Sequence, residues 1–237
     1  MTPQENFDFV NAYLRQVSPA IRAQGGFIVK YLGDGMMAVF PQGADDAIAA
    51  GLAKLRSVED YNQKREAQGF LPIAVGIGIH FGHMMVGMVG ESARMQGDAF
   101  SDNVNLTARL ESLTKLYGVS MIISDRAHSL LSDAAQYTTR FLDRVIVKGR
   151  SEPIDLYHVL EGESAQGIEL IQQTQPTFET GIAHYQAGDF QQAQTCFQQV
   201  LVQYPESKAA QVYCDRVATL MQNPPTQWRG VWKLAKK

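Results

Sequence analysis

The chain has 237 residues, of which 45% are hydrophobic and 19% are charged. This composition excludes a disordered or collagen-like chain and allows one ordinary domain with a small appendage. The net charge of -3 at pH 7 offers no basic field for wrapping nucleic acid, so nucleic acid is not an expected partner. No segment approaches the roughly 18 apolar residues of a membrane span. Two cysteines without metal or redox spacing, and no apolar leader, favour a cytoplasmic location.

The first third of the chain alternates helix and strand patterns. Apolar side chains recur at steps of three and four over residues 7–21, which predicts a helix that stops at the glycines at 25–26. Residues 27–40 hold two β-type runs around Gly-Asp-Gly at 33–35 and predict a hairpin. Residues 44–64 then predict a second helix.

The following residues complete a mixed pattern. A helix is predicted from Ser101 or Asp102 to Gly118, because leucines recur on one face and a glycine ends the run. The other predicted elements are strands at 73–79, 84–89, 119–123, 139–147 and 153–160, with a short helix after Asp125. Together they predict an α+β domain over residues 1–160, in which helices pack on a mixed sheet.

A small all-α segment is predicted beyond the sheet domain. Residues 161–177 are polar and predict a linker, and residues 222–237 predict a tail. Between them, residues 178–221 predict three helices, with turns at Gly188 and Pro205.

This segment resembles a tetratricopeptide repeat. Gly181, Ala193, Phe197 and Pro205 stand at the glycine, small, aromatic and proline positions, whereas the tyrosine is one place off, at Tyr185. One repeat cannot bury both of its faces, so we expect the helices to pack on the first domain or to bind a protein partner.

Two pairs of polar residues attract attention, and each has an ordinary explanation. Lys30 and Asp34 flank the predicted turn, where Asp-Gly is a common dipeptide and a strand lysine is usually a solvated charge. Asn105 and Arg109 lie one turn apart on a predicted helix and are compatible with an ordinary surface. Neither pair identifies a function by itself.

The glycines and histidines near the chain centre predict no separate site. Gly76, Gly78 and Gly82 do not form a dinucleotide-binding series, so we expect them to admit close backbone packing. His80 and His83 lack a third ligand at metalloprotease spacing, so zinc is not supported.

Three motifs in order carry a family resemblance. The chain contains K-x-x-G-D from Lys30, G-I-G-I-H-x-G from Gly76, and E-x-x-R-M-Q-G-D-x-x-S-D-x-V-N-x-x-x-R-L-E from Glu91. Each motif is weak alone, but their order and spacing over about residues 5–160 resemble the class III adenylate and guanylate cyclases. The resemblance implies a ferredoxin-like core, and 90–118 is its most specific part.

The resemblance implies roles at the base and at the metal. Asp34 would be one of two carboxylates that hold catalytic Mg²⁺ or Mn²⁺. Lys30 would donate a hydrogen bond to the adenine ring, and Asp98 would accept one from its exocyclic amine. Because guanine presents the opposite pattern at both edges, this pair implies ATP rather than GTP as substrate.

It also implies roles at the sugar and the phosphates. Asn105 would orient the ribose, and Arg109 would stabilise the charge that develops as pyrophosphate leaves. Lys148 stands where related enzymes place a phosphate contact, although a lysine before glycine is also a common surface turn. The activity implied is conversion of ATP to 3′,5′-cyclic AMP.

One family feature is absent from the sequence. The first metal carboxylate of the family lies in an F-x-D-[IV]-x-G-F-[ST] segment on a strand before the opening helix, and Asp8 falls on the helix instead. Three alternatives stay open: a truncated start, an inactive relative that binds nucleotide or a partner, or one half of a shared site. Family sites form between two cyclase domains, so the implied partner is a second such domain, as homodimer or heterodimer.

Overall fold

The computed structural model of the chain describes residues 2–234. Its helices and strands up to residue 162 are, in chain order, α1 (Pro3–Ala23), β1 (Phe27–Leu32), β2 (Gly35–Val39), α2 (Ala44–Ala67), β3 (Ile77–Ile79), β4 (Met85–Glu91), β5 (Arg94–Phe100), α3 (Asp102–Tyr117), β6 (Met121–Ser124), α4 (Asp125–His128), η1 (Ala134–Gln136), β7 (Thr139–Ile146), β8 (Ile154–Val159) and η2 (Leu160–Gly162). The predicted order of helices and strands is confirmed, except that β5 was not predicted.

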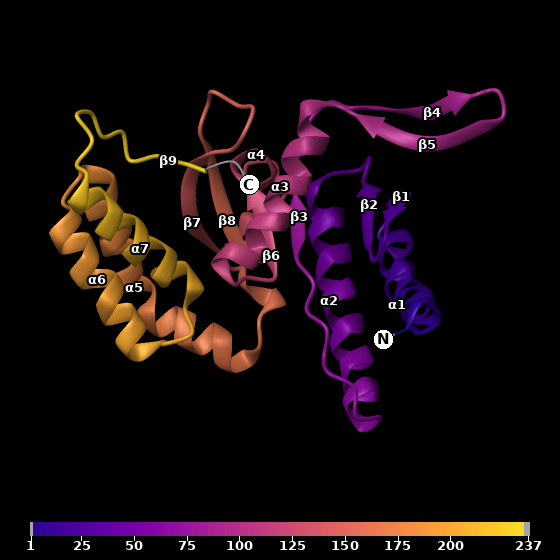
Figure 1. Ribbon diagram of the computed structural model, residues 1–237, viewed down its shortest axis with the longest axis horizontal. Coiled ribbons are helices and arrows are strands. Elements are labelled where there is room, and N and C mark those ends of the chain that lie inside the picture. Colours follow the sequence, from indigo (N-terminus) through magenta and orange to yellow (C-terminus); the bar gives the residue numbers. More distant parts are fainter. Residues whose placement is uncertain (1, 235–237) are drawn as a thin grey trace.

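A mixed five-stranded sheet forms the centre of the molecule (Figure 1). Its strand order is β3-β6-β8-β7-β9; β3 runs parallel to β6, whereas β8 is antiparallel to both β6 and β7. Helix α3 packs on this sheet through Leu106 and Leu110, which are fully buried, as the leucine spacing predicted. The α+β fold class with helices on a mixed sheet is therefore confirmed.

The two hairpins stand apart from this sheet. Strands β1 and β2 pair only with each other, and so do β4 and β5. The free edge of β3 carries no strand from within residues 2–234. The strands of residues 2–234 thus form three separate sheets, and the β4–β5 hairpin extends away from the body as an arm (Figure 1).

Helix α1 supports the first hairpin. Thr2 and Glu5 form a capping box at its N-terminus, and its inner face buries Val17 and Ile21 as predicted. Phe7 was expected on that face but is 64% exposed, whereas Phe9 packs against the hydrophobic cluster around Tyr13.

The C-terminal helices begin earlier than predicted. They are α5 (Ala165–Ala187), α6 (Phe190–Gln203) and α7 (Lys208–Gln222). Most of the predicted linker at 161–177 therefore belongs to α5, which starts behind the cap Ser164 and buries Ile171. Its glutamines are good helix formers, so a polar composition did not mean an irregular chain. The turns at Gly188 and before α7 lie where they were predicted.

The predicted tail returns to the sheet. Strand β9 (Trp232–Lys233) pairs with β7 and closes the sheet on that side. On the way, the Trp228 indole packs edge-on against Tyr185 and donates from Nε1 to its backbone carbonyl at 2.7 Å. Residues 235–237 of the predicted tail lie outside the described residues. No helix within 2–234 is long and apolar enough to cross a bilayer.

A buried polar cluster fastens α7 to the sheet domain. The Asp143 carboxylate on β7 pairs with Arg216 of α7 and accepts hydrogen bonds from Tyr117 and Tyr213. Arg216 also donates from Nη2 to the Tyr117 hydroxyl at 2.9 Å. All four side chains are at least 95% buried, so the C-terminal helices form a continuous interior with the sheet domain.

Candidate functional site

The two residues predicted to select the base are in contact. Lys30 lies on β1 and Asp98 on β5, and the Lys30 Nζ is 2.7 Å from each carboxylate oxygen of Asp98. The hydrogen bond from Lys30, helped by the backbone N–H of Ala99, holds the pKa of Asp98 below its ordinary value. The carboxylate is therefore an ionised acceptor at neutral pH, beside a donor that comes from a strand 68 positions away.

Asp34 stands alone at the tip of the first hairpin. Its side chain is exposed, as predicted, and the preceding Gly33 has a φ of +67°, the left-handed turn conformation that favours glycine. Burial, with a contribution from the Asp34 charge, raises the pKa of Tyr13 to about 12. The Asp34 carboxylate thus lies at the edge of the cluster between α1 and α2.

The surroundings of Asp34 do not complete a metal site. Within residues 2–234 no three histidine, cysteine or carboxylate side chains gather closely enough to hold a metal ion. The Asp34 charge instead reaches Lys54, an α2 lysine that is only 9% exposed. Burial lowers the pKa of Lys54, and Glu111 and Asp34 oppose that effect. Asp34 is a suitable ligand type for Mg²⁺, but one carboxylate does not make the two-metal arrangement that the family implies.

Asn105 and Arg109 occupy one face of α3, one turn apart. Ser101 caps this helix and accepts from the backbone N–H of Asn103 and Val104. Asn105 is exposed and Arg109 is half-buried.

A row of three glycines sets the position of α3. A methyl group at Gly78 would stand 2.7 Å from the Thr107 carbonyl oxygen, which is closer than packed atoms allow. Equivalent groups at Gly76 and Gly82 would strike Thr114 and Asn103. The prediction that these glycines admit close packing is confirmed, and the helix they admit is the one that carries Arg109.

The loop between β7 and β8 approaches Arg109. A methyl group at Gly149 would lie 3.7 Å from an Arg109 nitrogen, and the exposed Lys148 precedes this glycine. Arg150, which follows it, donates from Nη2 to the Asn103 side-chain oxygen at 3.0 Å. The loop thus brings its backbone at Gly149 beside Arg109 and its Arg150 side chain to the start of α3.

The sequence analysis did not predict the polar contacts around Asn103, at the start of α3. The Asn103 oxygen also lies 3.1 Å from His80 Nε2, and His80 Nδ1 lies 2.7 Å from the Ser124 hydroxyl. Both ring nitrogens of His80 are therefore engaged, so the ring serves as a structural link. Arg150 follows the predicted Lys148-Gly149, and this adjacency is the one sequence signal that could have revealed it.

The comparisons with known proteins identify the family of the chain. A model of the adenylate and guanylate cyclase catalytic domain family matches residues 1–161, more than half of the chain. The chain belongs to this family.

Two relatives are adenylate cyclases. The chain is 38% identical over 165 residues to an adenylate cyclase of Anabaena cylindrica, which covers 67% of this chain and 33% of that protein. It is 31% identical over 222 residues to the terminal-differentiation specific adenylate cyclase of Dictyostelium discoideum. That match covers 91% of this chain, so it extends into the C-terminal helices, but only 10% of the Dictyostelium protein. The chain thus spans at most about a third of these relatives.

Solved structures show the same fold. A bacterial light-regulated adenylyl cyclase matches with a TM-score of 0.60 and 28% identity, covering 73% of this chain and 51% of that one. The adenylyl cyclase CyaB from P. aeruginosa gives 0.58 and 28%, covering 70% and 86%. The guanylyl cyclase Cya2 gives 0.58 and 26%, covering 67% and 82%. These structures include both adenylyl and guanylyl cyclases, so the fold alone does not indicate whether the nucleotide base is adenine or guanine.

Proposed function

We propose that this chain supplies the nucleotide-recognising half of an adenylate cyclase site, which converts ATP to 3′,5′-cyclic AMP and pyrophosphate. The observation that carries the proposal is the contact between Lys30 and Asp98. These residues are far apart in sequence and come from separate hairpins, yet they place a donor and an ionised acceptor side by side.

This pair matches the Watson–Crick edge of adenine. Adenine has a ring nitrogen that accepts a hydrogen bond next to an amine that donates one. Lys30 would turn from Asp98 to the ring nitrogen, and Asp98 would accept from the amine. Guanine would set its ring N–H against the ammonium and its carbonyl against the carboxylate. A buried mismatch of this kind is expected to reduce binding by about 10²-fold or more.

The basic side chains near α3 are suited to binding the polyphosphate of ATP. Arg109 on α3 and Arg150 of the adjoining β7–β8 loop, with Lys148 in the same loop, would meet the phosphates, because guanidinium groups bind phosphate oxygens in a bidentate manner. Asn105, one turn before Arg109, has a donor and an acceptor for the ribose hydroxyls. Stabilising charge on the departing pyrophosphate is the role we assign to Arg109.

The metal contribution of this chain is partial. Mg²⁺ or Mn²⁺ would lower the pKa of the attacking ribose hydroxyl and neutralise the phosphates when bound. Asp34 would offer one carboxylate to it, and the family's first metal carboxylate is absent from these 237 residues. We therefore expect little cyclic AMP formation by the 237-residue chain alone.

Association with a second cyclase domain, in a homodimer or heterodimer, would complete the site. The β4–β5 arm exposes Met85 at 72% and Met88 at 62%, with Met95 and the adjacent valines also open to solvent. A two-stranded hairpin is marginal in water by itself, and a run of apolar side chains of this kind is typical of a contact surface. The arm is where we place the partner domain.

A second candidate function is that of an inactive binding module. The exposed arm and the single carboxylate at Asp34 also suit an inactive module that binds nucleotide or a partner domain without turnover. The C-terminal helices, which we keep as a tetratricopeptide-like unit, would then offer a surface for a protein partner.

The test is a comparison of ATP and GTP binding. We expect the chain to prefer a non-hydrolysable ATP analogue, and the double change Lys30→Glu, Asp98→Cys to shift preference toward the GTP analogue. Isothermal titration calorimetry of both proteins measures this. Equal affinity of the unchanged chain for the two analogues would remove the basis of the adenylate assignment, and absence of binding to either would favour a purely associative module.

A further inference from the structure

The segment after α7 runs from the C-terminal helices to the end of β7 (Figure 1). Its residues 228–234 form a C-terminal strap that contains β9. The pairing of β7 with β8 ends at Val145. Ile146, the last residue of β7, pairs with Lys233 of the strap, and its carbonyl accepts a hydrogen bond from the Leu234 amide at 3.1 Å. The strap therefore holds the end of β7 beyond its ladder with β8.

The first half of the strap is packed on α5 and α6. The Trp228 ring lies edge-on to Phe190, with the ring centres 5.6 Å apart, and its Nε1 donates to the Tyr185 carbonyl. Gly230 has a φ of +69°, the left-handed region that favours glycine, and a methyl group there would stand 3.2 Å from the Gln186 backbone. The strap thus follows one close path along α5.

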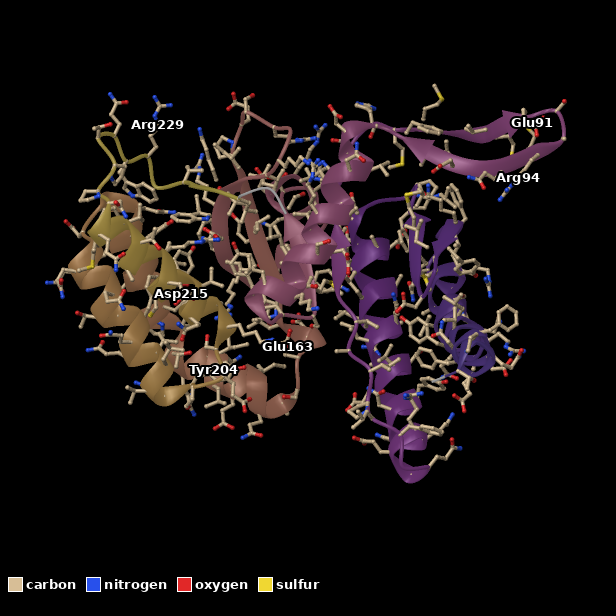
Figure 2. All side chains as sticks on the ribbon, viewed as in Figure 1. Glu91, Arg94, Glu163, Tyr204, Asp215 and Arg229 are labelled. Atoms are coloured by element: carbon tan, nitrogen blue, oxygen red, sulfur yellow. The ribbon has the colours of Figure 1, made fainter. Side chains whose placement is uncertain are left out.

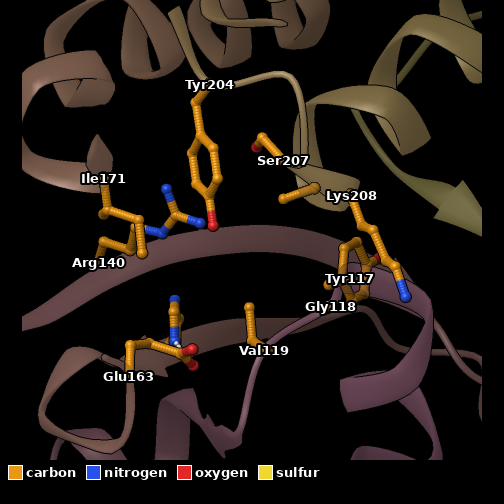
Figure 3. Close-up of a pocket in the computed structure, with 11 residues that line it drawn as sticks. Tyr117, Gly118, Val119, Arg140, Glu163, Ile171, Tyr204, Ser207 and Lys208 are labelled. Carbon is orange, nitrogen blue, oxygen red and sulfur yellow. Dashed lines mark hydrogen bonds and ion pairs between the residues drawn. The ribbon is translucent and has the colours of Figure 1, made fainter. Parts of the chain in front are cut away.

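Strand β7 also contacts the C-terminal helices through its side chains. At its start, Arg140 stacks on Phe178 of α5 with its guanidinium carbon 4.9 Å from the ring centre, and Tyr204 points toward it across a small pocket (Figure 3). In its middle, Asp143 pairs with Arg216 of α7. The register with β8 shifts just before Asp143, as at a β-bulge, which lets two residues three apart face the same helices. The C-terminal helices therefore fix β7 before the strap reaches its end.

Trp232 connects the strap to both supports. Its ring centre lies 5.2 Å from the guanidinium carbon of Arg216, the residue that pairs with Asp143. Its backbone pairs with Val145, one residue before the end of β7. One residue therefore contacts α7 through its side chain and β7 through its backbone.

The β7–β8 loop begins directly after the residues that the strap holds. Val147 is 2% exposed, and its carbonyl accepts from the Arg150 amide at 3.1 Å, which closes a turn. Lys148 is exposed in this turn, and the Arg150 side chain reaches Asn103 at the start of α3. The direction in which the loop leaves the sheet is therefore set at the end of β7.

We propose that Trp232 is a positioning residue, which holds the β7–β8 loop where Lys148 and Arg150 meet the polyphosphate. This role rests on the proposed nucleotide function and makes the C-terminal helices part of the same site. A loop that is ordered before binding loses less conformational entropy when the ligand arrives, so it binds more tightly. Lys30 and Asp98 lie on other elements, so binding of the base does not depend on the strap. A strap that only closed the sheet would affect stability without favouring phosphate over base.

The first measurement needs no nucleotide. Trypsin cuts after Lys148 in the loop and after Arg94 at the exposed tip of the arm, and mass spectrometry measures both rates. Cleavage at Arg94 serves as the internal reference. We expect Trp232→Ala to raise cleavage at Lys148 relative to Arg94 by about tenfold or more, because the loop opens locally. Gln227→Ala, an exposed change just before the strap, should leave this ratio unaltered.

A second variant tests the backbone pairing separately. Leu234→Pro lacks the amide from which the Ile146 carbonyl accepts, but it keeps the tryptophan ring on Arg216. It therefore reports on the loop even where Trp232→Ala lowers the stability of the whole chain. We expect the cleavage ratio to rise in this variant as well. An unchanged ratio in both variants overturns the proposal.

The second measurement separates phosphate binding from base binding. A non-hydrolysable ATP analogue and adenosine are titrated calorimetrically into the unmodified chain, Trp232→Ala and Gln227→Ala. We expect Trp232→Ala to weaken binding of the analogue by about tenfold and of adenosine by less than about twofold, with Gln227→Ala unchanged. Equal weakening of both ligands overturns the positioning role. If the unmodified chain binds neither ligand, the proposed function is refuted, whereas the trypsin ratio still decides whether the strap holds the loop.

Discussion

The two ends of the molecule differ in how completely their apolar side chains are buried. At the C-terminal end, helices α5–α7 share a continuous core with the sheet, and Asp143 and Arg216 pair in full burial. At the other end, the β1–β2 hairpin and the β4–β5 arm share no backbone ladder with any other strand within residues 2–234, and several apolar side chains of the arm are open to solvent. Figure 2 shows Glu91 and Arg94 at the far tip of the arm. Lys30 and Asp98, which we assign to the adenine base, are on the open end, and our proposal is that a second cyclase domain covers it.

The largest loss of stability is expected from disrupting the buried ion pair at the C-terminal end. Asp143→Ala would leave Arg216 buried without its carboxylate, which should reduce the free energy of unfolding by about 3–5 kcal/mol. The double change Asp143→Leu, Arg216→Met removes both charges and should lose less. Urea unfolding of the three proteins measures the difference. A single change that is no more harmful than the double one would contradict the account of a paired interior.

The row of glycines under α3 joins the two ends, so a change there should affect stability and nucleotide binding together. Gly78→Ala would force a methyl group against Thr107, and overpacking of this kind reduces stability by about 1–3 kcal/mol. ATP binding should weaken because Arg109 moves with the helix. Gly87→Ala, whose methyl group meets nothing within 4 Å, is the matched control for stability only, because Gly87 stands opposite Asp98 on the arm. Thermal unfolding measures the stability of both variants, and calorimetry measures the ATP affinity of Gly78→Ala. Equal stability of the two variants would contradict the close packing of α3 on Gly78.

The smallest effect on the fold, but a clear one on association, is expected at the open end. Met88→Glu places a charge in the middle of the arm and should weaken self-association by about tenfold or more, with stability changed by less than about 0.5 kcal/mol. Val202→Glu, at a site 81% exposed on α6, should leave association unchanged. Sedimentation velocity over a range of concentrations compares them. If both variants associate like the unchanged chain, the arm is not the contact surface.

Local patterns predicted most of the fold. The leucine spacing of α3 and its stop at Gly118, with a φ of +65°, required only the 3.6-residue period and the freedom of glycine. Strand β5 was not predicted because residues 94–100 do not alternate between apolar and polar side chains. It is a strand because it pairs with β4. The first half of helix α5, residues 165–177, was not predicted because glutamine-rich segments are polar in both linkers and helices.

The site was accessible to sequence reasoning only through the order of its motifs. No periodicity joins Lys30 to Asp98, and the family resemblance brought them together before their contact was seen. The burial of Lys54 and the contact of Arg150 with Asn103 depend on tertiary packing, so neither had a local signal.

The central claim is that this chain keeps the base, ribose and phosphate half of the site. Its most direct test mixes the 237-residue chain with a full-length relative that retains both metal carboxylates but whose own lysine, aspartate, asparagine and arginine set is disabled. Cyclic AMP formation is measured for each protein alone and for the mixture, with Arg109→Ala in this chain as the control. We predict activity only in the mixture, at least about 10²-fold above either protein alone and abolished by Arg109→Ala. A mixture that stays inactive although the heterodimer is present in solution would contradict the claim.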